Sequence, residues 1–151
     1  MKQKNIIGLI SRSETLGHKV AEQLLALGFF KLELNSKVKE FAKYLMKISG
    51  SDITPEIIKS IRERGYQVNR LYWVNLALAS VPESKEKIFI PDLRMEDTVA
   101  KVITTYFVGN LEEKASCPKD IIFVERTEIA ENYKDFAEKL AGSRFTRNVK
   151  A

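Results

Sequence analysis

The chain has 151 residues, of which 44% are hydrophobic and 30% charged, with a formal net charge of +5 and a pI near 9.3. This composition indicates one globular domain, and no apolar run reaches the ~20 residues that a membrane-spanning helix needs. A single cysteine, Cys117, and a single histidine, His18, exclude an internal disulfide and a zinc site built from cysteines. We therefore expect a cytoplasmic protein that does not enter the membrane. The basic balance indicates either ordinary solvated lysines or affinity for anions, mainly nucleotides and more weakly nucleic acid.

The first part of the chain has the pattern of a strand, a loop, a helix and a second strand. Residues 5–10 form a continuous apolar run, which is typical of a strand buried on both faces. Residues 11–17 are polar and predict a loop. An amphipathic pattern predicts a helix over 18–27, and residues 29–34 predict a second strand.

The middle of the chain predicts three helices. Asn35 or Ser36 is a candidate cap for the first of them, which ends near residue 50. A cap residue, a proline and an acid in "TPE" predict a second helix from residue 54 to Gly65. The apolar stretch 69–81 predicts a third, well buried helix.

The last part predicts alternating strands and helices. A short buried strand in "KIFIPDLR" ends at residues 91–92. Residues 96–107 have helical spacing, with a turn into strand as the alternative for the last of them. Residues 119–126 predict another strand and residues 128–142 a last helix. Residues 1–143 then form one domain, and residues 144–151 form a basic tail that we expect to fray.

This order of elements predicts an α/β fold in which helices flank a mostly parallel sheet. Ligands in such folds bind beyond the carboxyl ends of the strands. The loop after residue 10 and the loop at Asp92 therefore belong to the same edge of the sheet.

The stretch "SRSETLGHKV" has the position of a phosphate-binding P-loop but departs from its pattern. Such a loop wraps backbone N–H groups around phosphates, a lysine reaches the terminal phosphates, and the next hydroxyl holds Mg²⁺. Here the loop has one glycine, the lysine stands two residues after it, Val20 replaces the hydroxyl, and Glu14 repels phosphate. It is a degenerate cradle, a site for another anion, or a capped turn. The candidate phosphate-binding residues are Ser11, Arg12, Ser13, Thr15, Gly17, His18 and Lys19.

A second group of candidates follows the strand in "IFIPDLRMED". Asp92 is a candidate ligand for Mg²⁺, and Arg94 a candidate contact to phosphate. The alternatives are a mutual salt bridge or a helix cap. Arg126, which follows a later strand, is a candidate for the same edge.

A third group lies in "RERGYQVNRLYWVN", where three arginines stand near three aromatic residues. Arginines beside aromatic rings can hold a base by stacking and a phosphate by paired hydrogen bonds. In the alternative interpretation, Trp73 belongs to the core and the arginines are solvated.

Three of these blocks, in order, resemble the deoxynucleoside monophosphate kinases of phages and some bacteria, in the P-loop kinase superfamily. They are "IIGLISRSETLGHKVAEQLL", "IFIPDLRMEDTVAKVI" and "DIIFVER", and "YWVN" resembles the family's tryptophan-bearing helix. The resemblance implies a three-layer P-loop-kinase-like fold and ATP-dependent phosphate transfer to a deoxynucleoside monophosphate, with Mg²⁺. Ser11 and Arg12 match the start of its loop, Asp92 and Arg94 match its Asp-x-Arg block, and Arg126 matches its late arginine.

The departures from the family fall on the catalytic parts, because Glu14 and Leu16 replace glycines and the Gly-Lys-Ser/Thr ending is absent. Three hypotheses follow. The favoured one is a catalytically impaired relative that binds a nucleotide or a protein partner as a regulator. The second is an active kinase whose catalytic residues are Lys19, Arg12 and Asp92. The third is a protein- or nucleic-acid-interaction protein that keeps only the scaffold.

Overall fold

The computed structural model describes residues 4–50, 52–97, 103–130 and 132–150, with side chains at all of these except 130 and 143–150. Within this part of the chain, five strands form one sheet in which every neighbouring pair is parallel, in the order β2-β3-β1-β4-β5. The strands are β1 (Asn5–Ile10), β2 (Phe30–Lys31), β3 (Lys87–Ile90), β4 (Ile103–Gly109) and β5 (Ile122–Glu125).

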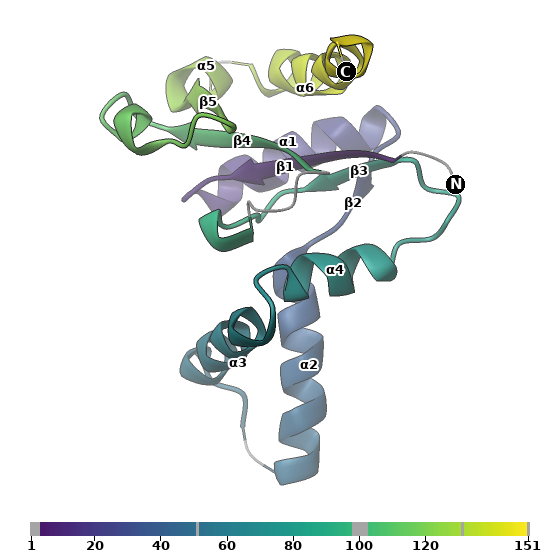
Figure 1. The fold of residues 1–151 in the computed structure, drawn as a ribbon, viewed down its shortest axis with the longest axis vertical. Coiled ribbons are helices and arrows are strands. Elements are labelled where there is room, and N and C mark those ends of the chain that lie inside the picture. Colours follow the sequence, from purple (N-terminus) through teal and green to yellow (C-terminus); the bar gives the residue numbers. More distant parts are fainter. Residues whose placement is uncertain (1–3, 51, 98–102, 131, 151) are drawn as a thin grey trace.

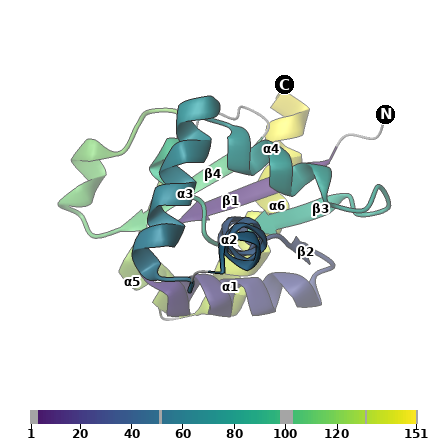
Figure 2. The same cartoon turned by 90° about the horizontal axis from the view of Figure 1, so that it is seen from below.

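Helices cover both faces of the sheet, which gives three layers (Figures 1 and 2). The expected α/β fold with a parallel sheet between helices is therefore confirmed. The helices are α1 (Glu14–Ala26), α2 (Leu34–Ser49), α3 (Pro55–Val68), α4 (Tyr72–Ala79), α5 (Arg126–Ala130) and α6 (Tyr133–Lys150), with short 3₁₀ turns η1 (Met95–Asp97) and η2 (Glu113–Ser116).

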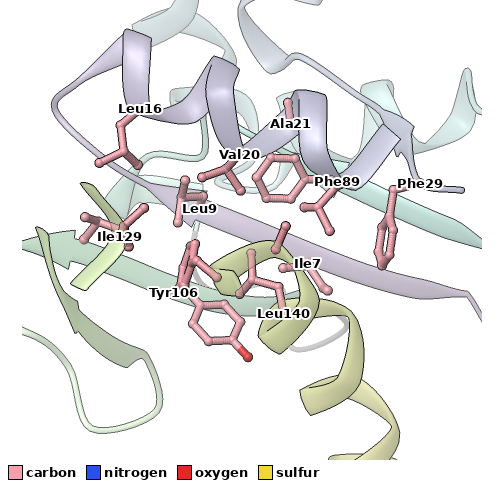
Figure 3. Packing of buried hydrophobic residues seen from close by; sticks show 14 residues of the cluster. Ile7, Leu9, Leu16, Val20, Ala21, Phe29, Phe89, Tyr106, Ile129 and Leu140 are labelled. Carbon is pink, nitrogen blue, oxygen red and sulfur yellow. The ribbon is translucent and has the colours of Figure 1, made fainter. Parts of the chain in front are cut away.

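One face of the sheet packs against α1 and α6 (Figure 3). Ile7 and Leu9 of β1 meet Val20 and Leu24 of α1, and all four side chains are fully buried. Burying one such side chain contributes roughly 1.5–3 kcal/mol. The alternate residues of β1 pack on the opposite face, so the strand is apolar on both sides, as its continuous apolar run predicts.

The opposite face packs against α4, and α2 and α3 project from that side. Val74 and Ala77 of α4 contact the cluster that contains Ile88 and Ile90 of β3. Figure 1 shows α2 and α3 as a pair that extends away from the sheet and meets α4. None of the described helices is long and apolar enough to cross a membrane.

The start of α1 differs from the prediction, and the difference changes the site. The predicted loop over 11–17 contains only residues 11–13, because α1 begins at Glu14 and not at residue 18. The Ser13 hydroxyl accepts a hydrogen bond from the Leu16 N–H at 3.2 Å and caps the helix three residues into the expected loop. The second strand is also shorter than predicted, since α2 already begins at Leu34.

The end of the helix predicted over residues 96–107 is a strand, the alternative that the sequence leaves open there. Residues 103–109 form β4, a central strand paired with β1 and β5, while residues 98–102 lie outside the described part. The run "ITTYFVG" is rich in β-branched and aromatic residues, which favour strands. The predicted last helix is divided into α5 and α6, and the backbone of α6 continues through most of the predicted tail to Lys150.

Candidate functional site

A cleft of about 600 Å³ opens at the carboxyl edge of the sheet. The ends of β1, β3 and β4 and the start of α2 all contribute to it, as the parallel strand order requires. It is lined by Ile10, Ser11, Arg12, Glu14, Asn35, Asp92, Leu93, Arg94, Met95, Glu96, Phe107 and Val108.

The loop after β1 is too short to be a phosphate cradle of the Walker type. Such a motif takes about eight residues, with the helix starting at its lysine, whereas only residues 11–13 separate β1 from α1. The Ser11 hydroxyl accepts a hydrogen bond from the Ser13 N–H at 3.1 Å, and Ser13 caps α1. Both serines therefore stabilise a tight turn from strand to helix.

Gly17, the one glycine of the predicted loop, lies in the first turn of α1 and is buried. A β-carbon there would stand 3.1 Å from the carbonyl oxygen of Pro91. The glycine thus allows α1 to approach the end of β3, which explains it without a phosphate. His18 is exposed and lines a second, smaller cleft of about 150 Å³, and Thr15 is exposed and lines neither cleft.

Lys19 does not belong to the cleft. Its side chain is exposed on α1, and its ammonium nitrogen lies 5.2 Å from the ring centroid of Tyr133 on α6. This geometry fits a cation–π contact. Lys19 lines neither cleft, so the structure does not bring it together with Arg12 and Asp92.

Asp92 caps α2 from a distant part of the chain. Its two carboxylate oxygens accept hydrogen bonds from the backbone N–H groups of Leu34 at 2.9 Å and Asn35 at 2.8 Å. Burial raises the pKa of this carboxyl, and the two N–H bonds oppose that rise. From the sequence, the alternative to a metal ligand is a cap for the helix that follows Asp92. The helix that Asp92 caps instead begins 58 residues earlier in the chain.

The residues around Asp92 do not fit a resident Mg²⁺ site. Both carboxylate oxygens already bind the backbone of α2. Val20, at the position after Lys19, is buried in the core and has no hydroxyl. Among the described residues, no group of three or more His, Cys, Asp or Glu side chains lies close enough to hold a metal ion.

Two arginines line the cleft together. Arg12 is 81% exposed, and its guanidinium lies 3.3 Å from a carboxylate oxygen of Glu113. The side chain of Arg94 is exposed, and its backbone N–H donates to Asp97 at 3.0 Å. The cleft thus has two cations that solvent and a ligand can reach.

A group of polar residues around the buried Asp97, which was not predicted from the sequence, holds the backbone of Arg94 in place. Asp97 is fully buried and accepts hydrogen bonds from the Tyr66 hydroxyl and the Arg94 N–H, both at 3.0 Å. Burial raises the pKa of Asp97, and burial together with the Asp97 charge raises the pKa of Tyr66. These bonds connect α3 to the loop after β3. Two spacings in the sequence could have indicated this group. Arg62 and Tyr66 are four residues apart, on one face of a helix, and Arg94 and Asp97 are three residues apart.

The arginines near Trp73 divide between structural and site roles. Trp73 is core, and its ring N–H donates to the carbonyl of Arg62 at 3.0 Å. The Arg62 side chain is half-buried, and burial and then the charge of Arg94 lower its pKa. Arg70 donates to the carbonyl of Glu96 at 3.2 Å. Arg62 and Arg70 therefore add positive charge beside Arg94.

Arg126 is not brought into the cleft. It is the first residue of α5, it is exposed, and it lines neither cleft described above.

Comparison of the chain with models of protein families, with curated proteins and with solved structures gives no match. The resemblance to nucleotide kinases therefore stays a prediction from the sequence.

Proposed function

We propose that this chain is a divergent nucleotide-kinase-like protein that binds a phosphate-bearing ligand, a nucleotide, in the cleft between Arg12 and Arg94. We further propose that it is impaired in phosphate transfer and acts as a nucleotide-binding or regulatory protein. The observation that carries the proposal is that these two arginines line one cleft while Lys19 lies over Tyr133.

The charges around the cleft support an anionic ligand. Guanidinium groups match the geometry of phosphate oxygens, and the amino end of α1 adds a partial positive charge. Arg62 stands close enough to Arg94 for the positive charge of Arg94 to lower its pKa, so an anion there relieves repulsion between the two. Glu14, Asp92 and Glu96 also line the cleft, but the α2 backbone already binds the carboxylate of Asp92.

The same geometry supports impaired catalysis. Phosphoryl transfer depends on positioned cations that neutralise charge on the transferred group. Lys19 points toward α6, and Asp92 caps α2. The lysine and the metal ligand of the usual machinery therefore both contact other parts of the fold. Both arginines line the cleft, where Arg12 also pairs with Glu113.

A thermal-shift screen of nucleoside mono-, di- and triphosphates, each with Mg²⁺ and with EDTA, tests the binding. We expect stabilisation by at least one nucleotide under both conditions, because the arginines supply the charge. Arg64→Gln, which removes an exposed cation that lines neither cleft, is the matched control for Arg94→Gln. Stabilisation by none of the nucleotides would refute the proposal. Rapid phosphate transfer from ATP would refute the impairment and favour an active kinase that uses ATP and Mg²⁺.

A protein-interaction role is a second candidate, favoured by the surface of α2. Phe41, Tyr44 and Ile48 follow one stripe of this projecting helix and are 38%, 64% and 70% exposed. Apolar side chains grouped in this way mark contact sites. Sedimentation of the wild type and of a Tyr44→Glu/Ile48→Glu variant tests whether the stripe joins copies of the chain. If the wild type stays monomeric at every concentration, the stripe does not join copies of the chain.

A further inference from the structure

Three apolar side chains form a row across β1, β4 and β5, level with the carboxyl end of β1. Ile10 is in register with Phe107, and Phe107 with Phe123, so all three point to the same face of the sheet. The two phenylalanine rings are stacked, with centroids 6.0 Å apart and an interplanar angle of 22°. All three side chains are partly exposed. Phe107 and Phe123 therefore form a partly exposed apolar surface beside the cleft.

Ile10 packs against the core cluster under α4, but neither core cluster accounts for the two phenylalanines of the row. The residues next to Phe107, Tyr106 and Val108, point the other way and are buried against α1 and α6. On the face of Phe107, the cluster under α4 includes Ile103 at the start of β4 but no described residue of β5. Neither Phe107 nor Phe123 is among the described residues that pack against either cluster.

The row adjoins the charged part of the cleft. Phe107 lines the same cleft as Arg12 and Arg94. A β-carbon on Gly109 would stand 2.8 Å from the Phe107 ring and 3.0 Å from the Glu113 carboxylate, which binds Arg12. An aromatic face, a cation and a carboxylate therefore lie next to one another.

This combination suits a ligand that has a planar ring at one end and an anion at the other. We infer that the base of the nucleotide lies against Phe107, which Phe123 supports from behind, with the phosphate toward Arg94 and Arg12. The inference rests on the proposed function and adds that the site selects nucleotides over phosphates that lack a base. Stacking of a base on an aromatic side chain increases affinity by about 5- to 150-fold.

Isothermal titration with AMP, dTMP and ribose 5-phosphate tests the inference. The wild type should bind at least one of the two nucleotides about tenfold or more tightly than ribose 5-phosphate. Phe107→Leu should remove most of this difference and leave the ribose 5-phosphate affinity unchanged, while Phe107→Tyr should retain it because the ring remains. Phe41→Leu makes the same change on α2, away from the cleft, and should leave the affinities for all three ligands unchanged. In NMR spectra, the base protons of the bound nucleotide should shift upfield with Phe107 and not with leucine.

The other outcomes are distinguishable. Equal affinities of the wild type for the nucleotides and ribose 5-phosphate would overturn the base site and leave the phosphate site standing. A Phe107→Leu variant that loses affinity for all three ligands equally would show a structural role and also overturn the base site. No binding of any of the three would overturn both this inference and the proposed function.

Discussion

Replacing Asp92 with alanine should destabilise the fold because Asp92 holds the amino end of α2. The change removes two hydrogen bonds, from the N–H groups of Leu34 and Asn35, and leaves both donors without this partner. Loss of a capping side chain costs about 0.5–2 kcal/mol, and a hydrogen bond to a charged group contributes about 1.5–3 kcal/mol. We expect a loss of about 2–3 kcal/mol in the free energy of unfolding, and a fall in Tm of roughly 5–10 °C.

Urea unfolding followed by circular dichroism measures this loss. Glu96→Ala is the matched control, because it removes another carboxylate that lines the cleft but is exposed. Asp92→Asn keeps one acceptor oxygen and should lie between the wild type and the alanine variant. An Asp92→Ala variant that is as stable as the wild type would refute the capping role. A variant that instead loses only Mg²⁺-dependent binding of nucleotide would show that Asp92 is a metal ligand.

Two further predictions concern the packing of α1 and the buried carboxyl. Gly17→Ala should cost about 1 kcal/mol, since its new methyl group stands 3.1 Å from the Pro91 carbonyl, whereas Gly142→Ala, with nothing within 4 Å, should stabilise α6 by up to about 1 kcal/mol. Equal effects in thermal unfolding would contradict the role of Gly17. Burial raises the pKa of Asp97 above its ordinary value of 3.8, so the folded state binds this proton more tightly than the unfolded state. The stability of the wild type relative to Asp97→Asn should therefore rise as the pH falls from 7 toward 4. A stability difference between them that is constant over this range, in urea titrations, would contradict the raised pKa.

The sequence predicts those elements whose signals are local. Residues 5–10, 87–90 and 122–125 are short apolar runs and form β1, β3 and β5 as expected. The Thr54 hydroxyl accepts from the Ile57 N–H at 3.2 Å, so the predicted start of α3 is confirmed. In both cases, neighbouring residues are enough to determine the structure.

The remaining parts of the fold and of the site depend on contacts between residues that are far apart in the sequence. Residues 103–107 have helical spacing as well as strand composition, and only their pairing with β1 decides between the two. The sequence does not show that Asp92 caps α2, because its oxygens bind a helix that begins 58 positions earlier in the chain. Its position after a strand therefore suggested a ligand for Mg²⁺. Gly17 suggested a phosphate-binding loop, but a glycine is needed there because the Pro91 carbonyl lies so close to α1. The connection from Tyr66 to Asp97 likewise crosses 31 positions.

The proposed function requires that the arginines of the cleft, and not Lys19, bind the ligand. Titration of the best-binding nucleotide into the wild type, Arg94→Gln and Lys19→Ala tests this claim directly. We expect Arg94→Gln to weaken binding by about tenfold or more, because a hydrogen bond to a charged group is lost. We expect Lys19→Ala to bind as the wild type does, since its side chain lies over Tyr133. Loss of binding in Lys19→Ala with Arg94→Gln unaffected would contradict the account.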